Sequence, residues 1–171
     1  HDPTPAALDR HLRYLSARYA IIPFDRLVQA LREGTFDQLP PRSLCVTIDD
    51  GHRRNRELLE VFARHGVVPT IYICSQIVGT NRHYWFLDTP DPEPLKPLSN
   101  SARLDRWAAH GFDQGADHAQ RQALSVAEIH EMRDTIAFGG HTRFHPILPR
   151  CTDDEAADEI AGCLPEIEAI T

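Results

Sequence analysis

The sequence predicts an α/β domain built on a parallel sheet. Three short apolar segments, 44–48, 70–74 and 136–138, have the length and composition of buried strands, and segments of helical periodicity separate them. Strands that alternate with helices are typical of parallel sheets, because neighbouring parallel strands need a crossover connection. Polar clusters directly follow the first and third segments, at the strand ends where catalytic groups lie in α/β barrels.

The composition fits a globular protein and argues against several classes of function. The chain has 171 residues, of which 42% are hydrophobic and 25% charged, enough to bury a sizeable core. A formal net charge of -7 makes a nucleic-acid partner unexpected. No segment approaches the roughly 18 consecutive apolar residues of a membrane span. The first residues carry no signal-peptide pattern, and the chain starts at His1 rather than at Met.

The four cysteines contain no C-x-x-C pair, which argues against a zinc knuckle or a thioredoxin-like centre. Cys45 and Cys74 lie inside apolar segments, so we expect both to be small core residues.

Two helices are expected before the first strand. Apolar residues recur at helical spacing from Leu8 to Tyr19, and a second short helix should begin at an N-cap Asp25 and end at Gly34. We expect these residues to form a packed accessory layer.

The first two strands and the helix between them are expected to form a βαβ unit. The segment 44–48 reads as a fully buried strand that ends at Asp49-Asp50-Gly51. A helix with an apolar face over 58–63 should stop at Gly66, before the buried strand 70–74.

The chain becomes irregular from Asn81 to about Asn100, with Tyr84-Trp85-Phe86 followed by four prolines. A long excursion in a compact domain is more often functional than accidental. The aromatic residues suit either stacking on a sugar ring or anchoring the loop to the core, and both interpretations stay open.

Two further helices are expected near the C-terminus. Ser125 and Glu128 form a capping box before the strand 136–138, and Thr152 opens a final helix that Pro165 should kink or interrupt. The residues of that helix expected to face the core are Ala156, Ile160, Cys163 or Leu164, and Ile167.

Asp49 and Asp50 leave the first predicted strand as adjacent carboxylates. Unpaired charges at the edge of a core lose hydration, so such a pair is costly unless it is used. Neighbouring side chains on extended backbone point in opposite directions, so one carboxylate can bind a cation while the other faces water or a substrate. A tight turn with a helix N-cap is the alternative interpretation, because Asp and Gly favour turns.

His141 and His145 are spaced i, i+4 within FGGHTRFHPI, residues 138–147. Pro146 disfavours helical backbone at His145, so we expect the pair on a loop turn directly after the strand. Two solvated loop histidines are the alternative. One carboxylate and two imidazoles would make a three-ligand, open-sided site suited to catalytic zinc.

The other histidines are weaker candidates. His52 can line a cleft beside the carboxylates or lie in a solvated first turn, and His65 suits a helix C-terminus. Surface positions are expected for His110, His118 and His130, which lie in polar surroundings.

Two motifs resemble those of the polysaccharide deacetylases with a NodB homology domain, carbohydrate esterase family 4. TIDDG, residues 47–51, resembles the family's first motif, T-F-D-D-G, with Ile48 in place of the phenylalanine. HTRFH, residues 141–145, resembles its second motif, H-S/T-x-x-H. Together the two motifs are fairly specific, whereas either alone would be weak.

The resemblance implies a distorted (β/α) barrel and metal-dependent removal of N- or O-acetyl groups, mainly from N-acetylglucosamine units. It implies that Asp49 is the general base, that Asp50, His141 and His145 hold a divalent metal, usually zinc, and that Thr142 helps to order the second motif.

The resemblance also implies a substrate and a place in the cell. The expected partner is an acetylated glycan, either a polysaccharide or a lipid-linked glycan. Trp85 would either contact this substrate or pack against the residues that do. The implied location is the cell envelope, the periplasm or the extracellular space.

Two later motifs of the family, R-x-P-F/Y and leucine-x-histidine, are not found in the sequence. A complete barrel of this type needs about 250 residues. We therefore expect one deacetylase-like domain over residues 1–171, with a leading helical segment at 1–40, the first part of the barrel at 41–171, and the C-terminal part missing. A non-catalytic metal- or glycan-binding domain and a hydrolase of a non-sugar amide are the alternative functions.

Overall fold

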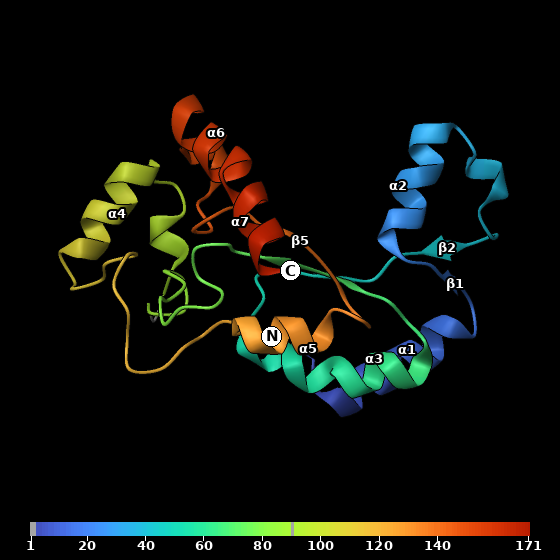
Figure 1. Cartoon of the computed structure of the whole chain (residues 1–171). Helices are drawn as coiled ribbons and strands as arrows, with labels where there is room; N and C mark the ends of the chain where they lie inside the picture. Colours follow the sequence, from blue (N-terminus) through green and yellow to red (C-terminus); the bar gives the residue numbers. More distant parts are fainter. Residues whose placement is uncertain (1–2, 90) are drawn as a thin grey trace.

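A computed structural model describes residues 3–89 and 91–171, and it confirms the predicted α/β class (Figure 1). The helices and strands are α1 (Pro5–Ser16), β1 (Ala20–Ile21), α2 (Phe24–Glu33), β2 (Ser43–Leu44), β3 (Thr47–Ile48), α3 (Leu59–His65), β4 (Thr70–Ile73), α4 (Asn100–Ala108), α5 (Val126–Met132), β5 (Ala137–Gly140), α6 (Asp153–Ala161) and α7 (Cys163–Ile170). Short 3₁₀ helices are η1 (Phe36–Gln38), η2 (Arg53–Leu58), η3 (Glu93–Leu95) and η4 (Leu148–Arg150). None of the described helices is long and apolar enough to cross a membrane.

The strands form two parallel sheets, one of β1 and β2 and one in the order β3-β4-β5. Thr47 of β3 is in register with Thr70 of β4, which is in register with Ala137 of β5. Because all three strands run in one direction, the loops that follow β3 and β5 emerge at the same edge of the sheet, on either side of the end of β4. This edge carries both polar clusters singled out in the sequence.

The predicted strand 44–48 is divided into β2 and β3, which pair with different partners. Cys45 is only half-buried and Thr47 is exposed, because β3 lies at an edge of its sheet within the described residues. The expectations of one fully buried strand and of a core position for Cys45 are therefore wrong. Cys74, at the end of the central strand β4, is fully buried as expected.

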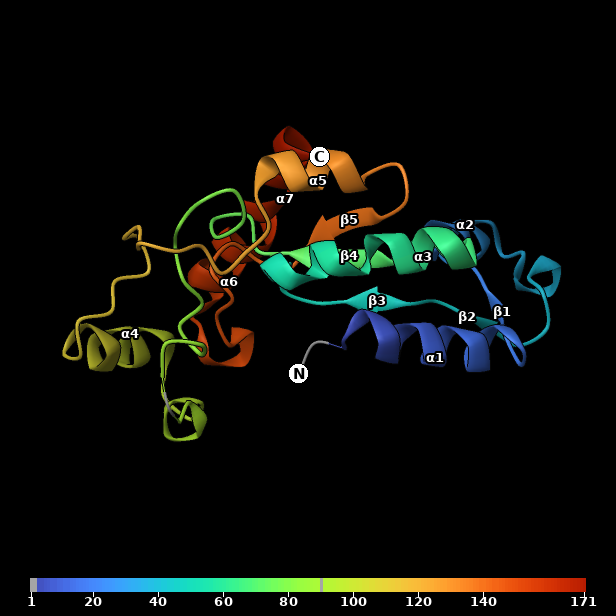
Figure 2. The same cartoon turned by 90° about the horizontal axis from the view of Figure 1, so that it is seen from below.

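The helices α1, α3 and α5 lie along one face of the three-stranded sheet (Figures 1 and 2). Their apolar faces and the side chains of β4 form the main core, in which Phe62, Ile71 and Met132 are fully buried. Gly34 and Gly66 end α2 and α3 in the left-handed conformation, as the sequence predicts.

The N-cap of α2 is Pro23, not Asp25 as predicted. Pro23 has the extended backbone of a cap residue, and the helix then starts early enough to place Asp25 in its first turn. A carboxylate in that turn still favours the helix, because it faces the positive end of the helix dipole.

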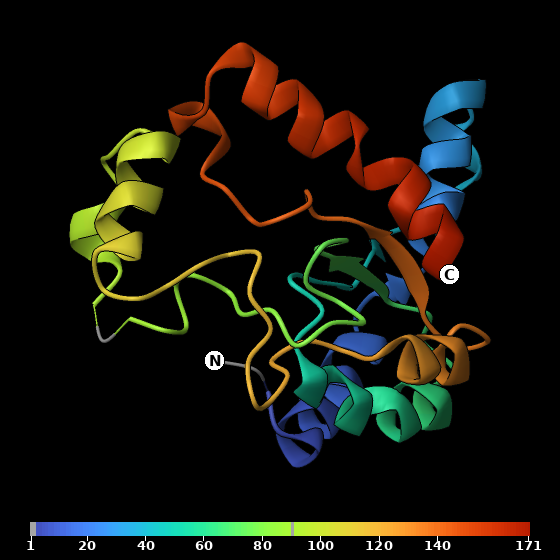
Figure 3. The same ribbon diagram turned by 60° about the vertical axis from the view of Figure 1, so that its left-hand side comes forward.

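The predicted last helix is divided at Gly162 into α6 and α7, which run almost end to end in Figure 3. Pro165 falls in the first turn of α7, where its missing N–H has no helical partner to lose. Cys163 and Ile167 are buried against β5, as expected. Of the alternatives Cys163 and Leu164, Cys163 is the one that faces the core. The inward placement predicted for Ile160 is wrong: it is 52% exposed, because it lines the open cavity beside His141 and His145.

The excursion after β4 is an ordered lobe that includes α4 and has its own apolar cluster, formed by Trp85, Leu95, Trp107 and Phe112. Trp85 is 5% exposed, and the buried guanidinium of Arg103 lies 4.7 Å above its ring. Tyr84 is also buried. In this structure both rings anchor the lobe to the rest of the chain, and neither offers an open face for a sugar.

The capping box of α5 provides the first testable prediction. Glu128 accepts two hydrogen bonds from Arg121, at 2.6 and 2.7 Å, and one from the backbone N–H of Ser125. Burial raises the pKa of Glu128, but these bonds outweigh it and hold the pKa below its usual value. The resulting stabilisation is therefore present at neutral pH and is lost as the pH falls through the folded-state pKa.

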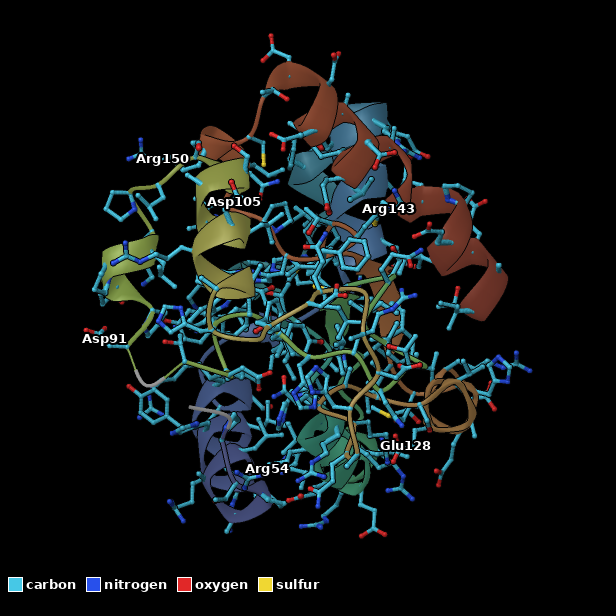
Figure 4. The ribbon with its side chains drawn as sticks, turned by 90° about the vertical axis from the view of Figure 1, so that its left-hand side faces the viewer. Arg54, Asp91, Asp105, Glu128, Arg143 and Arg150 are labelled. Atoms are coloured by element: carbon cyan, nitrogen blue, oxygen red, sulfur yellow. The ribbon has the colours of Figure 1, made fainter. Side chains whose placement is uncertain are left out.

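We expect Glu128→Gln to lower the free energy of unfolding by about 1 kcal/mol at pH 7 and by less at pH 3. Figure 4 labels Glu128, in the first turn of α5. Urea denaturation at both pH values measures the difference. Glu168→Gln, on an exposed position of α7, is the matched control. An equal loss of unfolding free energy for Glu128→Gln at both pH values would show that the charge of Glu128 does not stabilise the fold.

Candidate metal centre

The residues Asp50, His141 and His145 meet at the carboxyl ends of the strands β3 and β5. Asp50 Oδ1 lies 3.4 Å from His141 Nε2 and 3.0 Å from His145 Nε2. The imidazole ring centroids are 5.0 Å apart. The loop turn predicted for the two histidines is present, since no helix or strand covers residues 141–147. The structure thus brings three of the candidate site residues together at the carboxyl ends of the strands, although Asp50 follows one outer strand, β3, and the histidines follow the other, β5.

Left-handed backbone is concentrated in these two motifs. Among the described non-glycine residues, only four have positive φ, and three of them are Asp50 (75°), Thr142 (66°) and His145 (59°). This conformation costs energy, above all for the β-branched Thr142. Strained residues cluster at functional sites, where the surrounding structure holds them in place.

Buried contacts fix the backbone of Asp50. The hydroxyl of Tyr84 donates a hydrogen bond of 2.6 Å to the carbonyl oxygen of Asp50. Gly51 follows with φ of 77°, and a Cβ there would lie 2.6 Å from Ile73 Cγ2. Only glycine allows the chain to turn this tightly against β4, and the turn directs the Asp50 side chain toward the histidines.

The histidine loop is held by backbone hydrogen bonds from several directions. The N–H of His141 donates to the carbonyl of Ile73 at 2.9 Å, which continues the pairing of β5 with β4. The N–H of His145 donates to Thr142 Oγ1 at 3.1 Å, and Trp85 Nε1 donates to the carbonyl of His145 at 2.9 Å. Thr142 and Trp85 therefore position His145 through its backbone.

Acidic side chains from α6 and α7 support the same loop. Glu159 accepts hydrogen bonds from the backbone N–H groups of Arg143 and Phe144, at 2.7 and 2.9 Å. Arg143 forms ion pairs with Asp158 and Glu166, and Figure 4 shows it beside this helix pair. These contacts tie the loop to α6 and α7.

The two glycines before His141 allow close packing on both sides of β5. A Cβ at Gly139 would lie 2.8 Å from ring carbons of Tyr72, and a Cβ at Gly140 would overlap Cys163 Sγ. The strand can therefore approach both β4 and α7, which brings His141 to its position at the edge of the sheet.

Burial and charge favour the ligand forms of these groups. The pKa of His141 lies below its ordinary value, because burial and the neighbouring His145 disfavour the protonated ring more than Asp49 and Asp50 favour it. Burial raises the pKa of Asp50, but His145, His141 and His52 outweigh it and hold this pKa below its ordinary value. A neutral imidazole and an ionised carboxylate are the states that bind metal ions.

The donor set fits a cation. Asp50 Oδ1 is buried and makes no hydrogen bond with the described residues, although two imidazole nitrogens lie within hydrogen-bonding distance. Three groups with electron pairs to donate thus converge on one point. Two nitrogens and one carboxylate oxygen are ligands that zinc prefers, and they leave a coordination position open.

Asp49 differs from its neighbour, as predicted, although it is the left-handed turn at Asp50 and not extended backbone that separates the two carboxylates. It is exposed, and no described residue donates a hydrogen bond to its carboxylate. Its charge nevertheless acts on His141 and on Tyr72. A cavity of about 510 Å³ lies beside the centre, lined by His141, His145 and apolar residues of α6 and α7.

Several supporting residues could not be found from the sequence. Glu159 and Glu166 support the histidine loop through contacts that no local motif marks. Tyr84 belongs to the aromatic run singled out in the sequence, but its contact with Asp50, 34 residues away, could not be predicted. His118 is partly buried in a histidine cluster and not on the surface as expected.

Three solved structures resemble the fold. The Streptococcus pyogenes deacetylase PplD in complex with acetate has a TM-score of 0.65 and 14% identity over 98% of this chain and 58% of that chain. A de-N-acetylase from Aggregatibacter actinomycetemcomitans has a TM-score of 0.48 and 15% identity, over 81% of this chain and 44% of that chain. The BpsB deacetylase domain from Bordetella bronchiseptica has a TM-score of 0.49 and 15% identity, over 86% of this chain and 46% of that chain.

This chain therefore spans little more than half the length of the first structure, and identities this low carry only the fold. No curated protein sequence matches the chain significantly. The model of the family described as polysaccharide deacetylase matches residues 36–171, which is most of the sequence. The chain belongs to the polysaccharide deacetylase family.

Proposed function

We propose that this chain carries the metal centre of a deacetylase that removes acetyl groups, mainly N-acetyl groups, from amino-sugar units of a polysaccharide or lipid-linked glycan. One observation carries the proposal: the carboxylate of Asp50 and the imidazoles of His141 and His145 converge beside the exposed Asp49. Membership of the family supports the reaction class.

In this proposal Asp50, His141 and His145 hold a divalent ion, zinc in particular. When bound, such an ion supplies Lewis acidity and lowers the pKa of a water ligand to about 7. The chain itself holds the three ligands through backbone contacts: Tyr84 holds Asp50, Trp85 holds His145, and the carbonyl of Ile73 holds His141. The ligands therefore need little rearrangement on binding.

Asp49 is proposed as the general base. Its carboxylate is exposed beside the ligands and accepts no hydrogen bond from the described residues, so it remains available to take a proton from the attacking water. The half-buried Asp50, by contrast, already lies beside two imidazoles. In this proposal the two adjacent carboxylates have different roles, Asp49 as the general base and Asp50 as a metal ligand.

We further propose that residues 1–40 are a leading helical segment and that residues 41–171 form the first part of a larger barrel. The family match begins at residue 36, and the similarity to PplD covers 58% of that chain; both support this division. The arginine and leucine-x-histidine motifs implied by the resemblance would then come from outside these residues.

Acetate release tests the proposal directly. The protein that contains this chain is incubated with zinc and an oligomer of N-acetylglucosamine, and released acetate is measured. We expect Asp49→Asn to lower kcat by roughly 10²–10⁴-fold, because a positioned general base contributes about this much. In Asp49→Asn, the centre formed by Asp50, His141 and His145 should still bind one equivalent of zinc.

Asp37→Asn, an exposed position of η1, is the matched control and should keep full activity. Full activity in Asp49→Asn would refute the assigned base. A non-catalytic metal- and glycan-binding role is the second candidate, because Asp50, His141 and His145 can hold an ion without any reaction taking place. Zinc and oligosaccharide binding without acetate release would favour it, whereas acetate from a non-sugar amide would indicate a different substrate.

A further inference from the structure

We propose a second divalent-cation site, formed by His83, Asp88 and His118 in the lobe that follows β4. One ligand atom from each of these residues lies within 4.8 Å of the other two. The site shares no ligand with the Asp50–His141–His145 centre and does not depend on the proposed function. Two imidazoles and one carboxylate suit zinc or cobalt better than magnesium or calcium, which prefer oxygen ligands.

The surroundings of His83 orient it as a metal ligand. Its Nε2 lies 2.7 Å from the carbonyl oxygen of Gln120, which only accepts, so Nε2 carries the proton. Its Nδ1 faces both carboxylate oxygens of Asp88, at 2.9 and 3.0 Å. Metal-binding histidines characteristically donate their second ring N–H to a backbone carbonyl in this way. A cation between Nδ1 and the carboxylate would satisfy both groups.

His118 supplies the third ligand. Its ring stacks on that of His83, with centroids 3.8 Å apart and planes inclined by 10°. His118 Nε2 is buried and has no hydrogen-bond partner among the described residues. A shared ion requires the rings to tilt out of this stack, because each nitrogen lone pair lies in its own ring plane. Metal binding should therefore be visible in the spectra of both histidines.

The loops that carry these ligands are already tied together. The N–H of His118 donates to the carbonyl of Asn81 at 3.0 Å. Gln122 donates to Asp88 at 2.9 Å and accepts from the backbone N–H of Tyr84 at 2.8 Å. The ligands are thus held near one another without an ion, so binding requires little ordering of the chain.

The ion would have a structural effect on the first centre. Tyr84 directly follows His83, and its hydroxyl holds the Asp50 carbonyl, while the next residue, Trp85, holds the carbonyl of His145. An ion at His83 would fix the chain segment that supports both motifs. The second site would therefore stabilise the loop on which the first depends.

Zinc stoichiometry in a background without the first centre tests the proposal. Protein stripped with a chelator is dialysed against buffered zinc and measured by mass spectrometry of the metal. We expect two equivalents in the unsubstituted protein and one in Asp50→Asn. No zinc should remain in Asp50→Asn combined with either His118→Ala or Asp88→Asn.

The control is Asp50→Asn combined with His11→Ala, which removes an exposed histidine of α1 and should keep one equivalent. Circular dichroism with chelator present verifies that each variant is folded. In Asp50→Asn, zinc should shift the imidazole resonances of His83 and His118. No zinc in Asp50→Asn, or equal zinc with and without His118, would overturn the proposal, whereas one equivalent that survives Asp50→Asn and is lost with His118→Ala would count against the first centre only.

Discussion

Asp50→Asn is expected to abolish tight zinc binding at the first centre while leaving the metal-free fold intact. The substitution replaces an ionised ligand by a neutral amide between His141 and His145. Loss of supporting groups around metal ligands costs 10–100-fold in affinity, so loss of a ligand should weaken binding by at least about 100-fold. Competition with a chromophoric chelator measures this affinity, with the His83 cluster removed by His118→Ala.

Asparagine is the informative replacement because it tolerates the left-handed backbone at this position, where φ is 75°. Asp50 Oδ1 accepts no hydrogen bond from the described residues, so little structure should be lost with the charge. The melting temperature in chelator should therefore change little. Asp49→Asn serves as the control and should retain zinc, because Asp49 is not among the grouped ligands. Unchanged zinc affinity in Asp50→Asn would remove this residue from the centre.

Gly140→Ala is expected to lower the free energy of unfolding by about 2 kcal/mol, within the usual range for overpacking a core. The new methyl group would overlap Cys163 Sγ, where β5 packs against α7. Backbone shifts that relieve the overlap would also move His141, the next residue. We therefore expect weaker zinc binding together with lower stability, measured by urea denaturation and chelator competition.

Cys163→Ala provides a specific test of this mechanism because it removes the overlapping sulfur. Alone it should cost about 1 kcal/mol, as a small cavity replaces the buried thiol. Combined with Gly140→Ala it should be less destabilising than the sum of the two changes, since the methyl group then occupies the space of the sulfur. Gly115→Ala, whose Cβ would make only ordinary contact, is the control. Additive effects at Gly140 and Cys163 would show that another contact limits this position.

Local chemistry made much of the fold predictable. Glycines end α2 and α3, and Ser125 and Thr152 form the predicted capping boxes of α5 and α6. The three strands and their parallel order follow from short apolar segments separated by helices. These features depend on neighbouring residues, which is why a single sequence contains enough information to predict them.

What could not be predicted depends on contacts between distant residues. The division of 44–48 follows from a change of pairing partner, from β1 to β4. The exposure of Ile160 follows from its position on the open cavity beside the two histidines. The left-handed turn at Thr142 is contrary to the preference of its residue type, and only the surrounding structure maintains it. For the centre, the motif residues could be identified, but the contact of Tyr84 with Asp50 and the role of Glu159 could not.

The order of the strands has a consequence for the synthesis of the protein. Asp50 and His141 flank β4 from the two edges of one sheet, yet about ninety residues separate them in the chain. At 5–20 residues per second, a ribosome needs roughly 5–20 s to make that interval. Before β5 emerges, a single carboxylate offers a metal ion only a weak hold. Metal capture at this centre should therefore follow the docking of β5, as a late event in the maturation of the nascent chain.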